Sequence, residues 1–292
     1  MNTILITGSQ GFLGSALKRR LISAGYQVVG LDSCQGDIAD KDIFNSINGK
    51  NISHVYHLAA KTFVPDSWVN PSSFYKTNVM GTENVLEFCR INGLALTYVS
   101  AYLYGFPKQL PIAEDHPIDP NNPYAHSKFL AEQLCEFYAK QYQVKTTIIR
   151  PFNIYGADQD SKFLIPHIIN QLLSKETVKV KDLLPKRDYV YIDDVVEALM
   201  LTMRPVLDFS IYNIGAGYSL SVKEVIDTIQ DVLHTNKLVE TEEAARINEL
   251  SDVVADISKA QNVLKWQPKH SFRQGVAKIV QQNTEHPYSN VL

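Results

Sequence analysis

The sequence predicts an α/β fold: a doubly wound parallel sheet with helices on both faces, joined to a smaller α/β domain. Three observations predict it. Short apolar runs alternate with segments of helical periodicity through the first half of the chain. A glycine-rich loop from Gly8 to Gly14 separates the first run from the first helical segment. Polar residues stand where several runs end, and open α/β sheets bind their ligands at the carboxyl ends of strands.

The first half of the chain carries five expected strands and three expected helices. The strands are expected at 3–6, 26–31, 54–58, 94–100 and 145–150. The helices are expected from about 12 to 21, from Pro71 to about Asn92, and from about Pro123 to Tyr142. Because parallel strands need crossover connections, this alternation favours helices on both faces of one sheet. Residues 1–156 are therefore assigned to the first domain.

The second half of the chain is less regular and is assigned to a smaller domain, residues 157–292. The boundary is approximate, because the chain can cross back to the first domain. Asp193 or Asp194 is expected to cap a helix through Met203, and Ser221 to cap another to about His234. Further helices are expected at 163–174, 256–264 and 271–282. No proline- or glycine-rich linker separates the halves, so we expect them to pack tightly around a cleft.

Composition narrows the class of protein. The chain has 292 residues and a net charge of −3, so no basic field predicts binding to nucleic acid or to a membrane surface. Its three cysteines are widely spaced and form no Cys-x-x-Cys pair, so neither a metal site nor a disulfide framework is expected. No apolar stretch is long enough to span a bilayer. We expect a cytoplasmic protein with reduced thiols.

The loop from Gly8 to Gly14 has the composition of a phosphate-binding turn. Glycine permits the tight turn and lets backbone N–H groups approach a pyrophosphate at the start of a helix. Asp32 ends the second strand about eighteen residues later, where a carboxylate can accept hydrogen bonds from the adenosine ribose. No lysine or arginine lies between Asp32 and Lys41 to receive a 2′-phosphate, which favours NAD over NADP. Asp37 and Ile38 form a second candidate contact, with the adenine.

Tyr124 and Lys128 are four residues apart in a predicted helix, so both side chains lie on one face. A free phenol has a pKa of ~10, and a neighbouring ammonium moves that pKa toward neutrality. Ser100 ends the fourth strand, where its hydroxyl could polarise a substrate oxygen beside Tyr124. Together with the phosphate-binding loop, these residues predict a hydride-transfer enzyme.

Motifs along nearly the whole chain resemble the extended short-chain dehydrogenase/reductase superfamily, specifically its nucleotide-sugar epimerases, dehydratases and ketoreductases. They are Thr7-Gly8-x-x-Gly11-Phe12-Leu13-Gly14, His57-Leu58-Ala59-Ala60, Asn78-Val79-x-Gly81-Thr82-x-Asn84, Ser100 before Tyr104-Gly105, Tyr124-x-x-x-Lys128, Arg150-Pro151-Phe152-Asn153-x-Tyr155-Gly156, Arg187 to Asp194, and Asp256 to Ala260 with Trp266-x-Pro268.

The resemblance implies a Rossmann-type domain with NAD bound, a nucleotide-diphosphate sugar as substrate, and catalysis by Ser100, Tyr124 and Lys128. Tyr124 would be the acid/base, Lys128 would hold the nicotinamide ribose, and Ser100 would bind the sugar O4. The cofactor site would comprise Gly8, Gly11, Phe12, Leu13, Gly14, Asp32, Asp37, Ile38, Leu58, Ala59, Ala60, Asn78, Tyr124 and Lys128. The substrate diphosphate would be held by Asn153, Arg187 and Arg246. Helices 71–92 and 123–142 would pair two copies into a homodimer.

Departures from the family pattern exclude some reactions. Nucleotide-sugar 4,6-dehydratases carry acidic residues where this chain has Ala101 and Tyr102. GDP-fucose synthase-like enzymes carry a cysteine at the position of Tyr102, so a double epimerisation is also unsupported. The segments 32–36 and 181–186 are short, as in compact 4-keto-6-deoxyhexose reductases.

The residues leave three functions open. The first is an NAD-retaining nucleotide-sugar 4-epimerase that works through a transient 4-keto sugar, favoured by Asp32. The second is an NAD(P)H-dependent reductase of nucleotide 4-keto-6-deoxyhexoses, favoured by the chain length and the shortened loops. The third is a non-catalytic dinucleotide-binding protein, against which the set of Ser100, Tyr124 and Lys128 argues.

Overall fold

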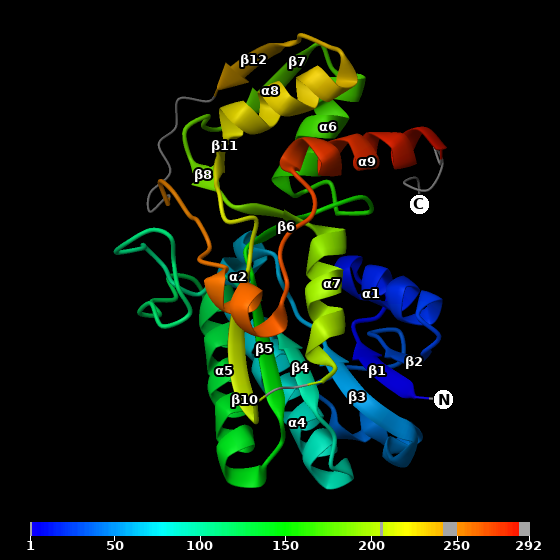
Figure 1. Cartoon of the computed structure of the whole chain (residues 1–292). Helices are drawn as coiled ribbons and strands as arrows, with labels where there is room; N and C mark the ends of the chain where they lie inside the picture. The colour runs from blue at the N-terminus through cyan, green and yellow to red at the C-terminus, as the bar shows by residue number, and fades with distance from the viewer. Residues whose placement is uncertain (1, 205–206, 242–249, 286–292) are drawn as a thin grey trace.

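A six-stranded parallel sheet forms the centre of the molecule in the computed structural model, which describes residues 2–204, 207–241 and 250–285 (Figure 1). The strand order is β10-β5-β4-β3-β1-β2. The bounds are β1 Thr3–Thr7, β2 Gln27–Leu31, β3 Ile52–His57, β4 Leu96–Val99, β5 Thr146–Pro151 and β10 Phe209–Ile214. The order reverses around β1, between β2 and β3, and a ligand crevice is expected at such a switch point.

Helices cover both faces of this sheet, as the alternating pattern predicted. Strand side chains alternate between faces, so Ile4 and Ile6 pack in one apolar cluster while Leu5 packs in another. The first cluster includes residues of α1 Phe12–Ser23 and α7 Ile192–Thr202. The second includes residues of α4 Gly81–Asn92 and α5 Pro123–Tyr142. The architecture is a Rossmann-type α/β fold.

Residues at the helix ends explain where the two long helices on the α4 and α5 face of the sheet begin and end. Helix α5 begins where Asn122 accepts a hydrogen bond from the Ala125 N–H at 2.9 Å and Pro123 occupies the first turn. The predicted helix from Pro71 to Asn92 is continuous but changes its winding. It consists of α3 Pro71–Tyr75, a π-helical turn η3 Lys76–Met80, and α4, which ends at the left-handed Gly93. Short helices were not predicted at η1 Lys41–Ser46, η2 Gly49–Asn51 and α2 Val64–Val69.

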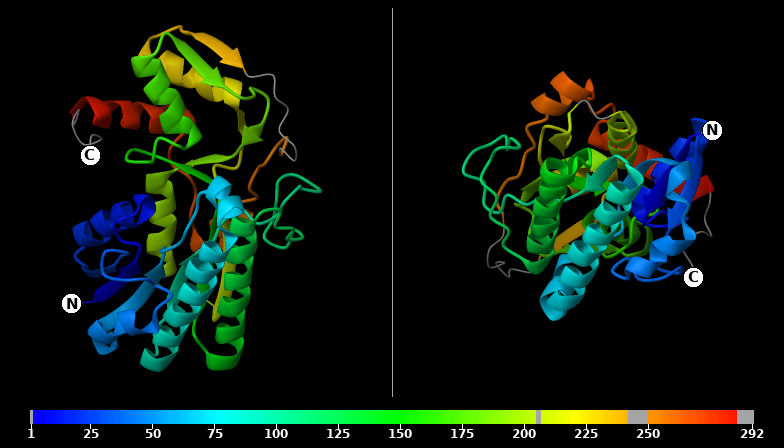
Figure 2. Two further views of the ribbon diagram at one scale, coloured as in Figure 1. Left: turned by 180° about the vertical axis from the view of Figure 1, so that it is seen from behind. Right: turned by 90° about the horizontal axis from the view of Figure 1, so that it is seen from below.

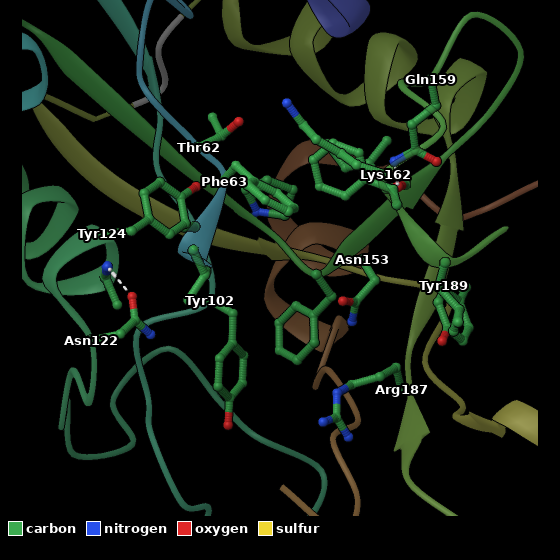
Figure 3. Close-up of a pocket in the computed structure, with 18 of the residues that line it drawn as sticks. Thr62, Phe63, Tyr102, Asn122, Tyr124, Asn153, Gln159, Lys162, Arg187 and Tyr189 are labelled. Atoms are coloured by element: carbon green, nitrogen blue, oxygen red, sulfur yellow. Dashed lines mark hydrogen bonds between the residues drawn. The ribbon is translucent and has the colours of Figure 1, made fainter. Parts of the chain in front are cut away.

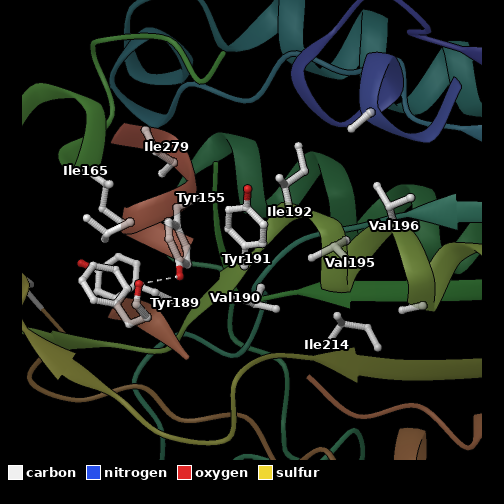
Figure 4. Close-up of a cluster of buried hydrophobic side chains, with 14 of the residues drawn as sticks. Tyr155, Ile165, Tyr189, Val190, Tyr191, Ile192, Val195, Val196, Ile214 and Ile279 are labelled. Atoms are coloured by element: carbon white, nitrogen blue, oxygen red, sulfur yellow. Dashed lines mark hydrogen bonds between the residues drawn. The ribbon is translucent and has the colours of Figure 1, made fainter. Parts of the chain in front are cut away.

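A second lobe lies beyond one end of the central sheet (Figure 2). Its elements are β6 Asn153–Tyr155, α6 Leu164–Ser174, β7 Thr177–Val180, β8 Lys186–Arg187, β9 Tyr189–Tyr191, β11 Leu220–Ser221, α8 Val222–Leu233, β12 Leu238–Thr241 and α9 Phe272–Glu285. The short helix η4 Ala260–Leu264 packs instead on α7 and β10. Figure 4 shows the apolar cluster that joins this lobe to the sheet, with Tyr155 and Tyr191 beside Ile192 and Val195. One continuous core therefore connects the lobe to the sheet.

The chain crosses back from its second half to the central sheet. Helix α7 packs on α1, and β10 pairs in parallel with β5. Helix α7 and strand β10 thus lie with the first domain in space, although the predicted division assigned them to the second. The domain boundary near residue 156 stays a prediction.

The expected cap by Asp193 or Asp194 is wrong, whereas that by Ser221 is confirmed. Helix α7 begins at Ile192, before both aspartates, so Asp193 and Asp194 lie in its first turn and no side chain caps it. Asp194 is buried and accepts hydrogen bonds from the Lys269 N–H, from the His270 N–H and from His270 Nδ1. The carboxylate holds the segment before α9 instead of starting its own helix. Ser221 forms a capping box with Glu224 at the start of α8.

Candidate active site

A cleft of about 1200 Å³ lies between the sheet and the second lobe (Figure 3). Thr62, Phe63 and Tyr124 stand on one side of it, and Arg187 and Tyr189 on the other. The predicted site residues that line it are Gly8, Gly11, Phe12, Leu13, Gly14, Leu58, Ala60, Ser100, Tyr124, Lys128, Asn153 and Arg187. The structure therefore gathers the candidate catalytic, cofactor and substrate residues around one space.

Five predicted residues in the described part of the chain do not line this cleft: Asp32, Asp37, Ile38, Ala59 and Asn78. The prediction for Arg246 falls outside the residues that the structure describes. Asp32 is tied directly to the glycine-rich loop: Ser9 Oγ donates to its Oδ2 at 2.5 Å and the Gln10 N–H donates to its Oδ1 at 2.8 Å. Its carboxylate is therefore held beside that loop, as a ribose contact would need.

The glycine-rich loop has the shape of an anion cradle. Gly8 adopts a φ of +75°, and a Cβ there would lie 2.8 Å from the Ala59 nitrogen. A Cβ on Gly14 would lie 1.9 Å from the Gly8 carbonyl oxygen, so only glycine allows α1 to approach the loop this closely. Gly11 caps α1 without a side-chain acceptor, and the first turn holds no acidic residue. The N-terminal N–H groups of α1 therefore suit a pyrophosphate.

Asn78 ties the cofactor wall to the helix that carries Tyr124. Its side-chain oxygen accepts from the Lys61 N–H at 2.9 Å, and its amide donates to the Lys61 carbonyl at 3.0 Å and to Ser127 Oγ at 2.9 Å. The side chain is buried. A direct contact of Asn78 with the cofactor stays a prediction.

Asp37 and Ile38 follow the second strand and contact η3 and α4. Asp37 forms an exposed ion pair with Lys76, 2.8 Å between Oδ2 and Nζ. Ile38 is buried against Gly81, and its carbonyl accepts from Asn84 Nδ2 at 3.0 Å. Their predicted contact with adenine remains a prediction.

Lys128 is buried beneath the cleft and points at the end of β4. Its Nζ donates to the Val99 carbonyl at 2.6 Å and lies 4.3 Å from the centre of the Tyr98 ring. Burial lowers the pKa of Lys128 from its ordinary value of 10.5 to about 7, an effect that the nearby Glu132 partly opposes. The amine therefore titrates near neutral pH.

The phenol of Tyr124 differs from the sequence-based expectation. Lys128 was expected to lower its pKa, but burial raises the pKa of Tyr124 above its ordinary value. The physical reason is desolvation by burial, which disfavours the charged phenolate. A phenol in this position needs a further positive charge in the cleft to act as a base near neutral pH.

Ser100 carries a buried hydroxyl that is aimed at no protein group in the described part of the chain. The residue is 4% exposed, and its Oγ has no hydrogen-bond partner there. Leaving a hydroxyl buried and unpaired costs ~1–3 kcal/mol, which makes such an atom a candidate contact for a ligand. Since Ser100 lines the same cleft as Tyr124, its position fits a substrate oxygen.

Arg187 and Asn153 occupy the second lobe's side of the cleft. Arg187 Nη1 donates to the carbonyls of Lys186 at 2.8 Å and Leu250 at 2.7 Å, which fixes the guanidinium at the rim. Asn153 Nδ2 donates to the Asp188 carbonyl at 3.1 Å. Planar guanidinium groups bind diphosphate oxygens in pairs, so this side suits a nucleotide diphosphate.

Sequence reasoning missed an aromatic contact that spans the cleft. Phe63, in the loop after β3, packs edge-on against Phe163 with 6.0 Å between ring centroids. Lys162 Nζ lies 4.8 Å from the centre of the Phe63 ring. These residues come from loops a hundred positions apart and follow no periodic pattern, so nothing in the sequence signals the contact.

The ring of Tyr102 forms part of the cleft wall. In the sequence, this residue stood out only because it occupies a position where the 4,6-dehydratases carry an acidic residue. Its Oη donates to the Gly105 carbonyl at 2.6 Å, and its ring packs edge-on against Tyr104 and Phe152.

Among the described residues, no group of three histidine, cysteine or acidic side chains could hold a metal ion. No helix in the described ranges has the length and apolarity to cross a membrane.

Known proteins resemble the chain along most of its length. A model of the NAD dependent epimerase/dehydratase family matches residues 4–215. The UDP-glucose 4-epimerase of Lactobacillus helveticus is 31% identical over 307 residues, which cover 91% of this chain and 92% of that protein. Two solved structures have closely similar folds. UDP-glucose 4-epimerase from Thermotoga maritima, with UDP-glucose, has a TM-score of 0.89 and 28% identity, covering 98% of this chain and 99% of that one. RMD from Pseudomonas aeruginosa, complexed with NADPH, has a TM-score of 0.88 and 25% identity, covering 96% and 98%.

Proposed function

The chain belongs to the NAD-dependent epimerase/dehydratase family, and we propose that it is a nucleotide-sugar 4-epimerase that retains NAD. The observation that carries the proposal is the convergence of Ser100, Tyr124 and Lys128 at one cleft, with the Ser100 hydroxyl buried and unpaired among the described residues. The likeness to UDP-glucose 4-epimerases supports the epimerase over the reductase. So does Asp32, whose carboxylate suits a free ribose hydroxyl.

The residues present fit a dinucleotide. The N–H groups at the start of α1 would hold its pyrophosphate, Asp32 its adenosine ribose, and Lys128 its nicotinamide ribose. When bound, the nicotinamide supplies a hydride acceptor that returns the hydride later in the same turnover. Leu58, Ala59 and Ala60 would form the wall behind it.

The chain's own side chains would manage the substrate proton. Tyr124 would remove the proton from the sugar O4 and give it back after the sugar has turned over in the cleft. Ser100 would donate its hydrogen bond to O4 and keep that oxygen beside the phenol. Because burial raises the pKa of Tyr124, the phenolate depends on positive charge beside it. The protonated Lys128 and the positive ring of oxidised NAD would supply that charge together.

The second lobe would bind the nucleotide diphosphate. Arg187 and Asn153 line the cleft opposite Tyr124, and Arg246 is proposed as a second diphosphate arginine. UDP-glucose and UDP-galactose are the first substrates to test, because the similar epimerases are named for UDP-glucose.

We also propose a homodimer in the cytoplasm. Exposed apolar side chains lie along the predicted pairing helices, among them Met80 at 52%, Ile91 at 67% and Phe137 at 52% exposure. A second copy would cover them. The three cysteines are free thiols, as a reducing compartment would keep them.

One experiment separates the candidate functions. The purified protein is examined for co-purified NAD(H) by absorbance and fluorescence, and is then incubated with UDP-galactose without added cofactor while proton NMR follows UDP-glucose. Bound NAD(H) with interconversion supports the epimerase. Protein that instead consumes added NADH or NADPH with a 4-keto-6-deoxy nucleotide sugar supports the reductase. Protein that binds dinucleotide and does neither would be the non-catalytic alternative.

A further inference from the structure

A buried ion pair lies beneath the candidate active site. Arg150, in β5, and Glu132, on α5, are 2% and 5% exposed. Arg150 Nε lies 3.0 and 3.2 Å from the two carboxylate oxygens of Glu132, and Nη2 donates to Oε2 at 2.6 Å. Helix α5 and strand β5 are in direct contact, and this pair joins them. A paired arrangement of this kind has a well-defined geometry, because the guanidinium is a rigid fork.

The same guanidinium reaches the segment that follows Ser100. Arg150 Nη1 donates to Tyr104 Oη at 2.9 Å and to the Glu114 carbonyl at 3.1 Å. Tyr104 Oη in turn donates to Asn213 Oδ1 at 2.6 Å. Arg150 therefore ties together α5, the segment after Ser100, and β10.

Glu132 also stands on the face of α5 that carries the acid/base residues. It follows Lys128 by four residues and Tyr124 by eight, spacings that keep side chains on one face. The hydrogen bonds of Arg150 thus reach both segments that supply the proposed catalytic set: α5, which carries Tyr124 and Lys128, and the segment that begins at Ser100. None of these hydrogen bonds involves a side chain of the proposed catalytic set itself.

We propose that Arg150 and Glu132 are positioning residues, a buried pair that holds the catalytic helix against the Ser100 segment and whose opposite charges cancel beside Lys128. Neither residue lines the cleft. Their effect on the reaction is therefore exerted through Lys128 and Tyr124.

The proposed cancelling of charges beside Lys128 follows from the titratable groups around this lysine. Burial keeps the other facing groups neutral: it lowers the pKa of His57 to about 3 and raises those of Tyr98 and Cys135. Around Arg150, burial likewise raises the pKa of Tyr104 to about 12 and raises that of Glu114. The carboxylate of Glu132 raises the pKa of Lys128. Removing it leaves the permanently charged Arg150 uncompensated, which disfavours a second cation nearby.

Two variants and one control test the proposal. The variants are Glu132→Gln and the double substitution Glu132→Gln with Arg150→Gln. The control is Glu136→Gln, one turn further along α5, where the carboxylate is 45% exposed and pairs with Lys140. Each protein is labelled with ¹³C at lysine Cε, the Lys128 signal is assigned by its loss in Lys128→Met, and its titration is followed by NMR. Circular dichroism confirms that each variant is folded.

In the wild type the Lys128 titration should have its midpoint near pH 7, as burial lowers its pKa to about 7. Glu132→Gln should lower the midpoint by about 1 pH unit, the low end of what a nearby charge does. The double variant should bring it back toward the wild-type value, because both charges are gone. Glu136→Gln should leave it unchanged. A purely structural pair predicts the opposite order, since the double variant loses more hydrogen bonds than the single one.

A double variant shifted as far as Glu132→Gln, or a single variant with no shift, overturns the charge-balancing role. The kinetic readout rests on the proposed function: the alkaline limb of the epimerase pH profile should move with the Lys128 midpoint. A wild-type protein without epimerase activity would overturn the proposed function alone. The lysine titration needs no substrate and would still decide the proposal about the pair.

Discussion

Lys128 donates a hydrogen bond to the carbonyl of Val99, 2.6 Å away and one residue before Ser100. The contact joins helix α5 to the end of β4 directly beneath the cleft. It fixes the distance between the segment that carries Tyr124 and the segment that carries Ser100. Lys128, itself one of the proposed catalytic residues, therefore holds the segments of Ser100 and Tyr124 together.

Replacing Tyr124 with phenylalanine should abolish turnover and leave substrate affinity nearly intact. The ring still fills its place in the cleft, but the proton relay is lost, and general acid–base catalysis is typically worth ~10²–10⁴-fold. The measurement is the turnover number together with a calorimetric dissociation constant for UDP-glucose. Tyr142→Phe, at the exposed end of the same helix, is the matched control. Near-normal turnover by Tyr124→Phe would refute the assigned mechanism.

Replacing Lys128 with methionine should change how stability depends on pH. Burial lowers the pKa of this lysine from 10.5 to about 7, so between those values the unfolded chain binds more protons than the folded one. The buried charge of Lys128 therefore lowers the wild-type free energy of unfolding most below pH 7. This free energy increases as the pH rises from 7 toward 10.5. The Tm of Lys128→Met minus that of the wild type should be larger at pH 6.5 than at pH 9.5. The exposed Lys140→Met should show the same difference at both pH values; a pH-independent difference for Lys128→Met would contradict the buried titration.

Asp32 should make the protein prefer NAD(H) over NADP(H). Its carboxylate is held beside the glycine-rich loop by Ser9 and the Gln10 N–H, where a 2′-phosphate would meet a negative charge. Dissociation constants for both cofactors measure this preference. Asp32→Asn should reduce the difference between the dissociation constants for NAD(H) and NADP(H). The amide keeps the shape of the side chain but no longer repels the 2′-phosphate. Equal or tighter binding of NADP(H) by the wild type would show that Asp32 does not select the cofactor.

Replacing Arg187 with alanine should mainly raise the Michaelis constant for the nucleotide sugar. A contact with the diphosphate is present in the ground state and the transition state alike, so the turnover number should change little. Steady-state kinetics over a range of UDP-glucose concentrations provides the measurement. Lys186→Ala is the control, since its side chain is exposed next to Arg187. A fall in turnover at an unchanged Michaelis constant would place Arg187 in the chemical step instead.

No 4,6-dehydratase activity is expected. Elimination of water across C5 and C6 needs an acid and a base after the catalytic serine, and those positions hold Ala101 and Tyr102. The Tyr102 hydroxyl is already bonded to the Gly105 carbonyl, and burial raises its pKa. Incubation with UDP-, dTDP- and GDP-hexoses, followed by mass spectrometry, should reveal no 4-keto-6-deoxy product. Formation of that product would mean that other groups supply the acid and the base.

The sequence by itself determined the features that depend on short-range spacing. The bounds of α5 follow from Asn122, Pro123 and the apolar pattern up to Tyr142, all within one segment. The cradle from Gly8 to Gly14 follows in the same way, since glycine positions fix the backbone locally. The meeting of Ser100 with the Tyr124 segment could also be predicted, because strand ends of a parallel sheet gather at one edge.

Only the tertiary structure decided what depends on residues distant in the sequence. The contact of Phe63 with Phe163 and the use of Asp194 to hold His270 join loops that no periodic pattern relates. The rise in the pKa of Tyr124 also belongs here, because desolvation depends on every atom that excludes water from the phenol. Spacing along a helix predicts which side chains are neighbours, but the dielectric around them is set by the packing of the whole fold.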